Sequence, residues 1–276
     1  KLTLENPQEG PYTDILSEFE GGGTQSYHGL LMNVERRAAK GVIVNANYAW
    51  SHCIGDLTDF TGSGPNPGQD DWQVDNNRRA DRANCISDRR HNVNLTAVAE
   101  TPRFGNNTLR AVASGWRVSG IYRISSGSPL NLTTGIDNSL TGKLGSGATS
   151  TQRPNQVLAD PYGGSSKPGA SYINVAAFAM PATGTFGNLG RNALTGPGIW
   201  SFDTALSRVF RFHESQRLEI RAEAYNLTNS FRPGCSAAAV GCPTGGINTT
   251  VNNGAFGQIR NSLEPRIMQF AMKYVF

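Results

Sequence analysis

The clearest pattern in this sequence is an alternation of apolar and polar residues that recurs in separate stretches. The C-terminal stretch, residues 264–276, shows it best, because Met268, Phe270, Met272, Tyr274 and Phe276 occupy every second position. A period of two is the signature of a β-strand with two different faces. We therefore predict that the chain ends in a strand with one apolar face.

The same alternation predicts further strands upstream, joined by connections of two kinds. The expected strands are residues 26–37, 42–53, 90–100, 109–126, 199–212 and 217–226. Short turns are expected at 38–41, 101–107 and 213–216, and long loops rich in Gly, Pro, Ser and Asn at 54–87, 127–198 and 230–265. Short and long connections thus alternate strictly along the chain.

This arrangement predicts an all-β fold, an antiparallel transmembrane β-barrel segment of about seven strands. Long extracellular loops and short periplasmic turns are typical of outer-membrane barrels, and a barrel strand needs only ~9–11 residues. The final strand must then descend, so Phe276 lies at the periplasmic face. A soluble β-sandwich binding module is the alternative, but it predicts shorter strands and connections of similar length.

Composition agrees with a β-rich chain and narrows the functional classes. Hydrophobic residues make up 38% and charged residues 17%, and there is no apolar run of about 18 residues, so no transmembrane helix is predicted. The net charge of +4 is mild and interspersed, which gives no argument for nucleic-acid binding. The N-terminus lacks an initiator Met and a signal-peptide pattern, so we expect a fragment or a processed product.

The four cysteines predict disulfides rather than a metal site. No CxxC pair or His cluster accompanies Cys53, Cys85, Cys235 and Cys242, and all four lie in or beside predicted loops. Four cysteines allow three connectivities; the favoured pairs are Cys53–Cys85 and Cys235–Cys242. Both would form on the external side, in an oxidising compartment.

Several short runs, in order, resemble a known family. They are NANYAWS at 45–51, Arg90-His91, GWRVSGI at 115–121 with SGSP at 126–129, FGNLGRNALTG at 186–196, RAEAYNLTN at 221–229, and Phe256-Gly257. Together they resemble the C-terminal barrel of TonB-dependent outer-membrane receptors, closest to the Oar-like group with an N-terminal carboxypeptidase-regulatory-like domain. The resemblance covers nearly the whole chain.

The resemblance implies a barrel of about twenty-two strands that encloses a plug domain, with energy supplied by TonB. Residues 1–276 would then be the C-terminal part of one barrel domain, and the plug and further strands would lie before Lys1. The implied function is ligand uptake across the outer membrane, with the external loops capturing a ligand that no loop motif identifies. The implied partners are membrane lipid, TonB, the plug, and the barrel-assembly machinery, which reads a C-terminal aromatic such as Phe276. A plug-less structural or adhesive surface barrel is the alternative.

Charged residues on the polar face are the candidates for lining the barrel interior. Spacing places Arg217, Glu219, Arg221 and Glu223 on one side of a single strand, and Asp203, Arg117 and Arg123 follow the same parity on their strands. Two roles stay open for them, a structural network that contacts the plug and direct contact with the ligand.

The aromatic residues at strand ends are candidates for belts at the membrane surfaces. They are Trp50, Trp200, Phe210, Phe212, Tyr274 and Phe276, which a sandwich would bury instead. No nucleophile elbow or HExxH motif occurs, so we expect no enzyme activity and no cofactor. The aspartates between 56 and 88 lack the spacing of an EF-hand and are expected in a solvated loop, paired with Arg78, Arg79, Arg82 and Arg89.

Overall fold

The computed structural model of the 276-residue chain describes residues 22–39, 41–56, 72–74, 77–141, 152–212, 216–234 and 246–276. Its main feature is one antiparallel sheet of seven long strands, with a short eighth strand, β3, paired to the end of β2. The order across the sheet is β1-β2-β4-β5-β10-β11-β12, so each long strand pairs with its nearest long neighbours in sequence.

The elements have the following bounds. The long strands are β1 (Gln25–Ala39), β2 (Val42–Gly55), β4 (His91–Glu100), β5 (Trp116–Ser125), β10 (Ile199–Arg211), β11 (Arg217–Tyr225) and β12 (Ile267–Val275). The short elements are η2 (Arg78–Asp81), β3 (Ala83–Asn84), α1 (Asn107–Ala113), β6 (Pro129–Leu130), β7 (Asn155–Gln156), η4 (Val175–Ala177), β8 (Phe178–Ala179) and β9 (Leu194–Thr195).

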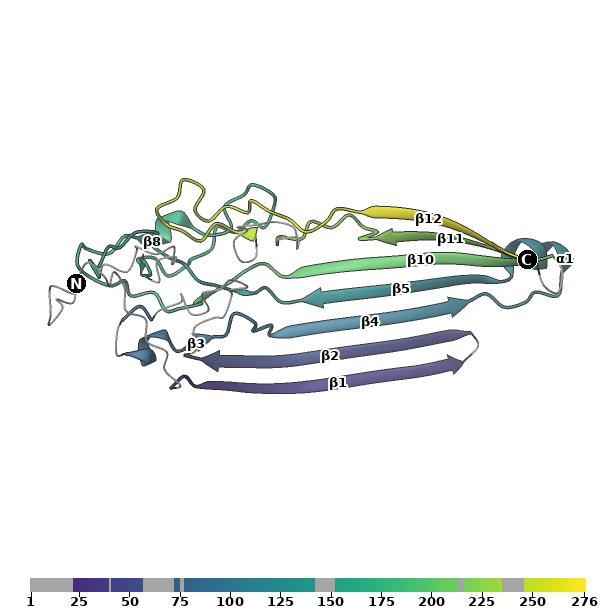
Figure 1. Ribbon diagram of the computed structural model, residues 1–276, viewed down its shortest axis with the longest axis horizontal. Coiled ribbons are helices and arrows are strands. Elements are labelled where there is room, and N and C mark those ends of the chain that lie inside the picture. Colours follow the sequence, from purple (N-terminus) through teal and green to yellow (C-terminus); the bar gives the residue numbers. More distant parts are fainter. Residues whose placement is uncertain are drawn as a thin grey trace, which may run out of the picture.

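The two ends of the sheet differ, as the alternation of connections predicts. Figure 1 shows the long loops gathered at one end of the strands, here called the loop end. The opposite, turn end holds α1 and the C-terminus (Figure 1). All seven predicted strands are present and their pairing is antiparallel throughout, so the predicted fold class is confirmed.

Strand register separates the residues into an apolar and a polar face. One row across the apolar face contains Val42, Ala99, Val118, Leu206, Ala222 and Phe270. The adjacent row on the opposite face contains Glu100, Arg117, Ser207, Arg221 and Ala271. Because side chains alternate between the two faces of a strand, shifting one strand by a single residue would move its polar side chains to the apolar face.

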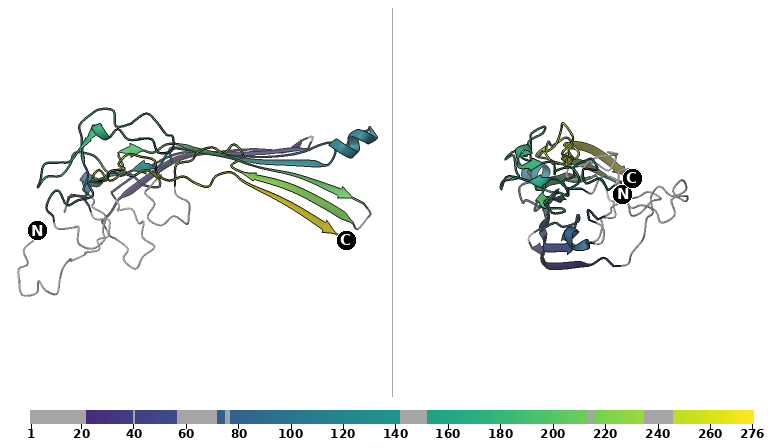
Figure 2. Two further views of the ribbon diagram at one scale, coloured as in Figure 1. Left: turned by 90° about the horizontal axis from the view of Figure 1, so that it is seen from above. Right: turned by 90° about the vertical axis from the view of Figure 1, so that its left-hand side faces the viewer.

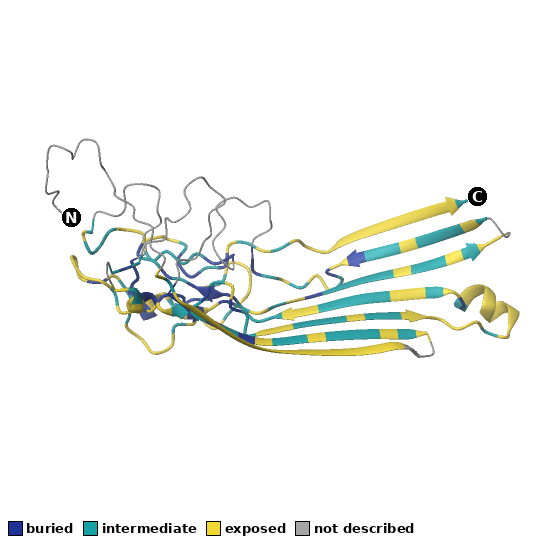
Figure 3. Cartoon of the chain, turned by 60° about the horizontal axis from the view of Figure 1, so that its bottom comes forward, coloured by how far each residue is buried: buried dark blue, intermediate teal, exposed yellow. Residues whose placement is uncertain are grey.

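The apolar face is not covered by other described parts of the chain. Phe270 is 78% exposed and Met272 75% exposed, and Figure 3 shows the strands mainly in the colours of exposed and intermediate residues. The sheet is also open, because β1 and β12 each pair on one side only among the described residues. Seen from above, β10 to β12 fan away from the other strands toward the turn end (Figure 2). None of the helices in the described ranges is both long and apolar enough to span a membrane.

The connection between β4 and β5 differs from the prediction. We expected a short turn at 101–107 and a strand from residue 109, whereas the chain forms α1 and starts β5 only at Trp116. The cause is local, since the Asn106 side chain caps the helix by accepting hydrogen bonds from the N–H groups of Thr108 and Leu109, at 2.8 and 3.3 Å. Gly115, with φ +77°, then redirects the chain into β5.

The loop end carries the hydrophobic core of the described structure, which the sequence pattern did not reveal. Ten buried residues from two loops cluster there: Leu130, Leu132, Ile173, Ala177, Phe178, Leu189, Leu194, Ile247, Phe256 and Ile259. We call this packed part of the loops between β5 and β10 and between β11 and β12 the loop cap. The segment 127–198, expected only as a long loop, contains the two short ladders β6–β9 and β7–β8.

Candidate functional site

The polar face of the sheet carries an ion pair between β5 and β10. Arg123 Nη1 lies 3.2 Å from Asp203 Oδ2. The other oxygen of Asp203 accepts a hydrogen bond from the backbone N–H of Asn226, at 2.8 Å. Asn226 is buried and has a positive φ of 50°. Asp203 thus fixes both the cation on one neighbouring strand and the turn that follows the other.

Two further ion pairs lie on the same face. Arg117 Nε is 3.7 Å from Glu100 Oε1 between β5 and β4, and Arg221 Nε is 2.5 Å from Glu223 Oε1 along β11. Both arginines are about half exposed, so these pairs contribute little to stability. Their effect is to keep ionised groups fixed over the face.

The remaining charged candidates continue this arrangement toward the turn end. Arg217 lies directly opposite Arg211 of β10, and Glu219 lies opposite Lys273 of β12. Register therefore brings all seven charged candidates named from the sequence onto one face of three adjacent strands, β5, β10 and β11. Their role toward a ligand or a plug stays a prediction.

Amides extend the polar face across β1 and β2. Asn33 Nδ2 donates to Asn47 Oδ1 at 2.5 Å, and Asn47 Nδ2 donates to Asn45 Oδ1 at 2.7 Å. Asn94 lies opposite Asn47 and Arg123 lies opposite Asn94, so amides and cation share one row. Polar side chains thus occur on this face in every long strand, together with a few apolar ones such as Leu31, Ile43 and Val209.

The aromatic candidates lie on the apolar face, at its two ends. Trp50 lies opposite Leu30 and His91 near the loop end, where the rings of Trp200 and Tyr122 are 5.9 Å apart. At the turn end, the Tyr274 and Phe276 rings stack at 6.2 Å, and Phe210 and Phe212 complete the set. Two bands of aromatics thus border the exposed apolar strip; their role as interfacial belts stays a prediction.

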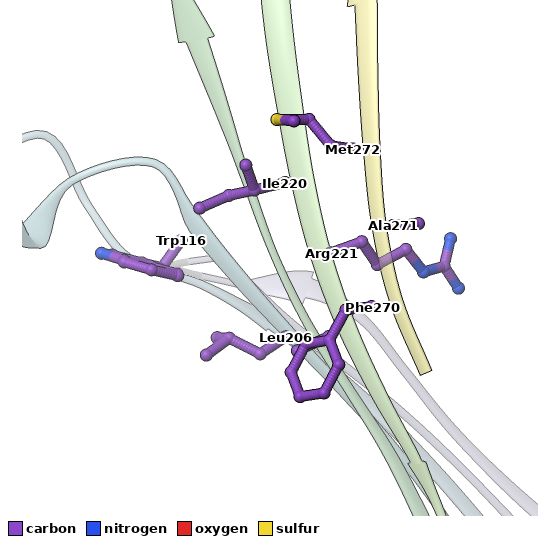
Figure 4. A pocket seen from close by; sticks show the side chains of 8 residues that line it. Trp116, Leu206, Ile220, Arg221, Phe270, Ala271 and Met272 are labelled. Atoms are coloured by element: carbon purple, nitrogen blue, oxygen red, sulfur yellow. The ribbon is translucent and has the colours of Figure 1, made fainter. Parts of the chain in front are cut away.

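The apolar face is hollowed near the turn end. Figure 4 shows a groove lined by Trp116, Leu206, Ile220, Phe270 and Met272, together with Ala222, Ala271 and Arg221. Its volume is about 380 Å³. The small side chain of Ala222 lies between Leu206 and Phe270 in one row, which leaves the depression.

Arg208 lies beside this groove and was missed by sequence reasoning. It sits on the apolar face, opposite Trp116 on one side and Ile220 on the other. Its guanidinium carbon lies 5.2 Å from the Trp116 ring centre and 4.5 Å from that of Phe210, within the range of cation–π contacts. It donates hydrogen bonds to the carbonyls of Val112, at 3.0 Å, and Ala111 at the end of α1. The sequence did contain a signal for its position, because Arg208 alternates in step with the apolar residues Leu206 and Phe210 and so lies on their face of the strand.

The predicted disulfide at the loop end is confirmed. Cys53 and Cys85 are bonded, with their Cα atoms 5.4 Å apart, and tie the end of β2 to the segment that follows β3. Cys53 N–H also donates to Asp88 Oδ1 at 2.9 Å. Cys235 and Cys242 lie outside the described residues.

The described aspartates of the first long loop are not solvated as expected. Asp56, Asp81 and Asp88 are all buried, because each has a specific donor. The carboxylate of Asp81 pairs with Arg153, which belongs to a different loop and also donates through Nε to the carbonyl of Leu189 at 2.9 Å. Burial lowers the pKa of Arg153, and the charge of Asp81 opposes this effect. The pair fastens the first loop to the loop cap.

Asp56 fastens the first strand to the second. It accepts hydrogen bonds from Thr24, with Oδ1 2.5 Å from the backbone nitrogen and Oδ2 3.0 Å from Oγ1. Burial alone would raise the pKa of Asp56, but the bonds from Thr24 outweigh it and hold that pKa below its ordinary value. Asp59, Asp70, Asp71 and Asp75 lie outside the described residues.

Two runs that suggested a family have structural roles in the loop cap. In the run 186–196, Asn192 adopts φ +50° and donates to the carbonyl of Asn84 at 2.7 Å, while a Cβ on Gly187 would lie 2.1 Å from the Arg153 carbonyl. In the second run, the buried Phe256 ring meets that of Phe178 edge-on at 6.0 Å. Gly257 has φ +77°, and a Cβ there would lie 2.9 Å from the Ile173 carbonyl.

Comparison with known proteins agrees with this arrangement of faces. A family model described as outer membrane beta barrel domain matches residues 3–269. No curated protein and no solved structure matches the chain. Within the described ranges, no group of three or more His, Cys, Asp or Glu side chains could hold a metal ion.

Proposed function

Because the chain belongs to the outer membrane β-barrel domain family and so to the cell outer membrane, we propose that it is part of a receptor that imports a ligand with energy from TonB. The observation that carries the proposal is the difference between the two faces of the sheet. One face is apolar and exposed, which suits lipid, and the other bears ion pairs and amides, which suit a hydrated interior.

The open sheet requires further strands in a membrane. Unpaired N–H and C=O groups along β1 and β12 would each cost several kcal/mol in hydrocarbon, so spanning sheets are closed. We propose that additional strands bridge these two edges and that the described strands form the C-terminal part of one barrel domain. The turn end would face the periplasm and the loop end the exterior.

In this arrangement, the polar face lines the path of the ligand and meets a plug. Arg117, Arg123, Arg217 and Arg221 would present donors to anionic or hydroxylated groups, and Asp203, Glu219 and Glu223 keep the net charge of the path low. Each partly exposed ion pair contributes little to stability. It can therefore break and form again with a charged group of a moving ligand or plug. A ligand or plug can thus pass without a large barrier at any one pair.

The loop cap would hold the external binding surface. Its buried core makes the loops a preformed scaffold, and binding residues on loops are commonly positioned by rigid parts of a fold. A preformed surface also reduces the ordering cost of binding.

The test is whether the full-length protein binds the periplasmic domain of TonB. In detergent, we expect a saturable complex in which added outer-membrane extract from the native cell, as a source of ligand, strengthens binding. Failure to bind TonB under both conditions would sink the receptor proposal.

The packed loop cap also favours a second candidate, a plug-less surface barrel that binds partners through its loops. The two differ in conductance. A plug-less barrel in a planar bilayer should conduct ions steadily, whereas a plugged receptor should stay closed until denaturant loosens the plug.

A further inference from the structure

Arg208 is a cation on the membrane-facing side of an outer-membrane protein. In the described residues it forms no ion pair, and its two hydrogen bonds go to neutral backbone carbonyls of α1. A guanidinium has five N–H donors, so three remain for another acceptor. A charge beside lipid is costly unless it reaches the interface or meets an opposite charge.

The apolar groove begins directly beside this cation. The cross-strand neighbours of Arg208, Trp116 and Ile220, are both groove walls, and the groove continues past Leu206 to Phe270 (Figure 4). Its lining side chains are nearly all apolar. The end of the groove beside Arg208 therefore offers cationic hydrogen-bond donors. The rest of the groove has apolar walls and extends away from the turn end.

We propose that Arg208 and this groove form a binding site for an anionic phospholipid. The acyl chain lies in the groove between Trp116 and Phe270, and the phosphate accepts hydrogen bonds from Arg208. Charge selects this occupant, because an apolar segment of a protein would fill the groove but leave Arg208 without a counter-ion. The site uses the leaflet at the turn end and does not depend on transport or TonB.

Contacts around Arg208 prepare it for this role. The Trp116 and Phe210 rings and the α1 carbonyls hold the guanidinium in place before lipid binds. Preorganisation lowers the ordering cost of binding, so a single phosphate contact gains more affinity than it would from a mobile side chain. In this proposal, helix α1 between β4 and β5 positions Arg208 through its carbonyl groups, which a tight turn could not do.

Native mass spectrometry of the full-length protein in mixed micelles tests the site. With phosphatidylglycerol as probe, we expect one molecule retained more strongly than phosphatidylcholine. Arg208→Gln should weaken phosphatidylglycerol binding about fivefold, the effect of one cation near an anionic lipid surface. Arg211→Gln is the matched control, because Arg211 lies at the same end on the polar face, and it should bind as wild type. Equal retention of both lipids, or unchanged binding by Arg208→Gln, would overturn the proposal.

A second variant tests the groove while leaving Arg208 in place. Ala222→Leu fills the floor and should reduce phosphatidylglycerol retention at least as much as Arg208→Gln. Ala99→Leu is its control, since Ala99 lies in the same apolar row outside the groove. If Ala222→Leu retains the lipid like wild type, the acyl chain does not lie in the groove and the proposal fails.

Discussion

Arg153 and Asp81 form an ion pair whose side chains are only 3% and 2% exposed. The two residues come from different long loops, and backbone bonds strengthen the junction: Gln73 N–H donates to Asp81 Oδ2 at 2.9 Å, and Arg153 N–H donates to Gln73 Oε1 at 3.0 Å. The first loop and the loop cap are thus joined by a buried charged contact.

Removing one partner of this pair should open the junction. Arg153→Gln leaves the Asp81 carboxylate buried without its counter-ion, and we expect a loss of about 3–5 kcal/mol in the local opening free energy. Hydrogen exchange of the amides of residues 187–194 measures it. Arg37→Gln is the control, because the pair of Arg37 with Glu35 is exposed and its loss should be barely measurable. Equal protection in both variants would contradict the assignment.

A methyl group at Gly257 should destabilise the loop cap. Gly257→Ala forces a residue with a Cβ into a left-handed conformation, which costs about 1–2 kcal/mol, and the added carbon would also approach the Ile173 carbonyl to 2.9 Å. Gly254→Ala is the matched control, since a Cβ there would meet nothing within 4 Å. Limited proteolysis of the loops should be faster for Gly257→Ala only; similar rates for both variants would refute the strain argument.

Alkaline pH should loosen the contact between Tyr172 and Thr195. Burial, with the nearby Tyr162, raises the pKa of Tyr172 to about 12, and its hydroxyl donates to the Thr195 carbonyl at 2.9 Å. An unfolded tyrosine loses its proton near pH 10, so this stabilising contribution is complete below about pH 10 and is lost as the pH rises through about 12. Tyrosinate absorbance should lose a late-titrating component in Tyr172→Phe; an unchanged titration in the variant would exclude Tyr172.

Reduction of the Cys53–Cys85 disulfide should release the first long loop. The bond closes a loop with a sequence separation of 32, for which chain entropy predicts about 3–4 kcal/mol of stabilisation. Cys53→Ser should therefore lower the unfolding temperature, and treatment of wild type with reductant should reproduce the change. Thiol labelling that is equal with and without reductant would show that the bond is absent in the native protein.

The strands were predictable because each is long enough to show the alternation of apolar and polar residues in the sequence itself, without knowledge of its neighbours in the fold. The C-terminal stretch shows this best, since β12 falls inside the predicted range 264–276 and its alternate residues lie on one face. The charged candidates on β11 follow from the same parity. Helix α1 was missed because its seven residues span about two turns, too few for helical periodicity; the capping Asn106 was the usable signal.

The loop cap was unpredictable for a different reason. Its core joins residues as distant as Leu130 and Ile259, each in a segment without periodicity, and its ladders are two residues long. Partners such as Arg153 for Asp81 depend on how separate loops fold over each other. Arg208 could have been placed on the apolar face by parity, but its contacts with α1 could not, since the helix itself was not predicted.

The shared core of the loop cap limits which parts of the two loops can change independently. Leu130, Ile173 and Leu194 come from one loop, and Ile247, Phe256 and Ile259 come from another. Transplanting either loop alone into a relative would leave its share of this core without the residues that it packs against. Sequence changes that keep the core packed are therefore confined to the outer residues of the cap, or must exchange both loops together.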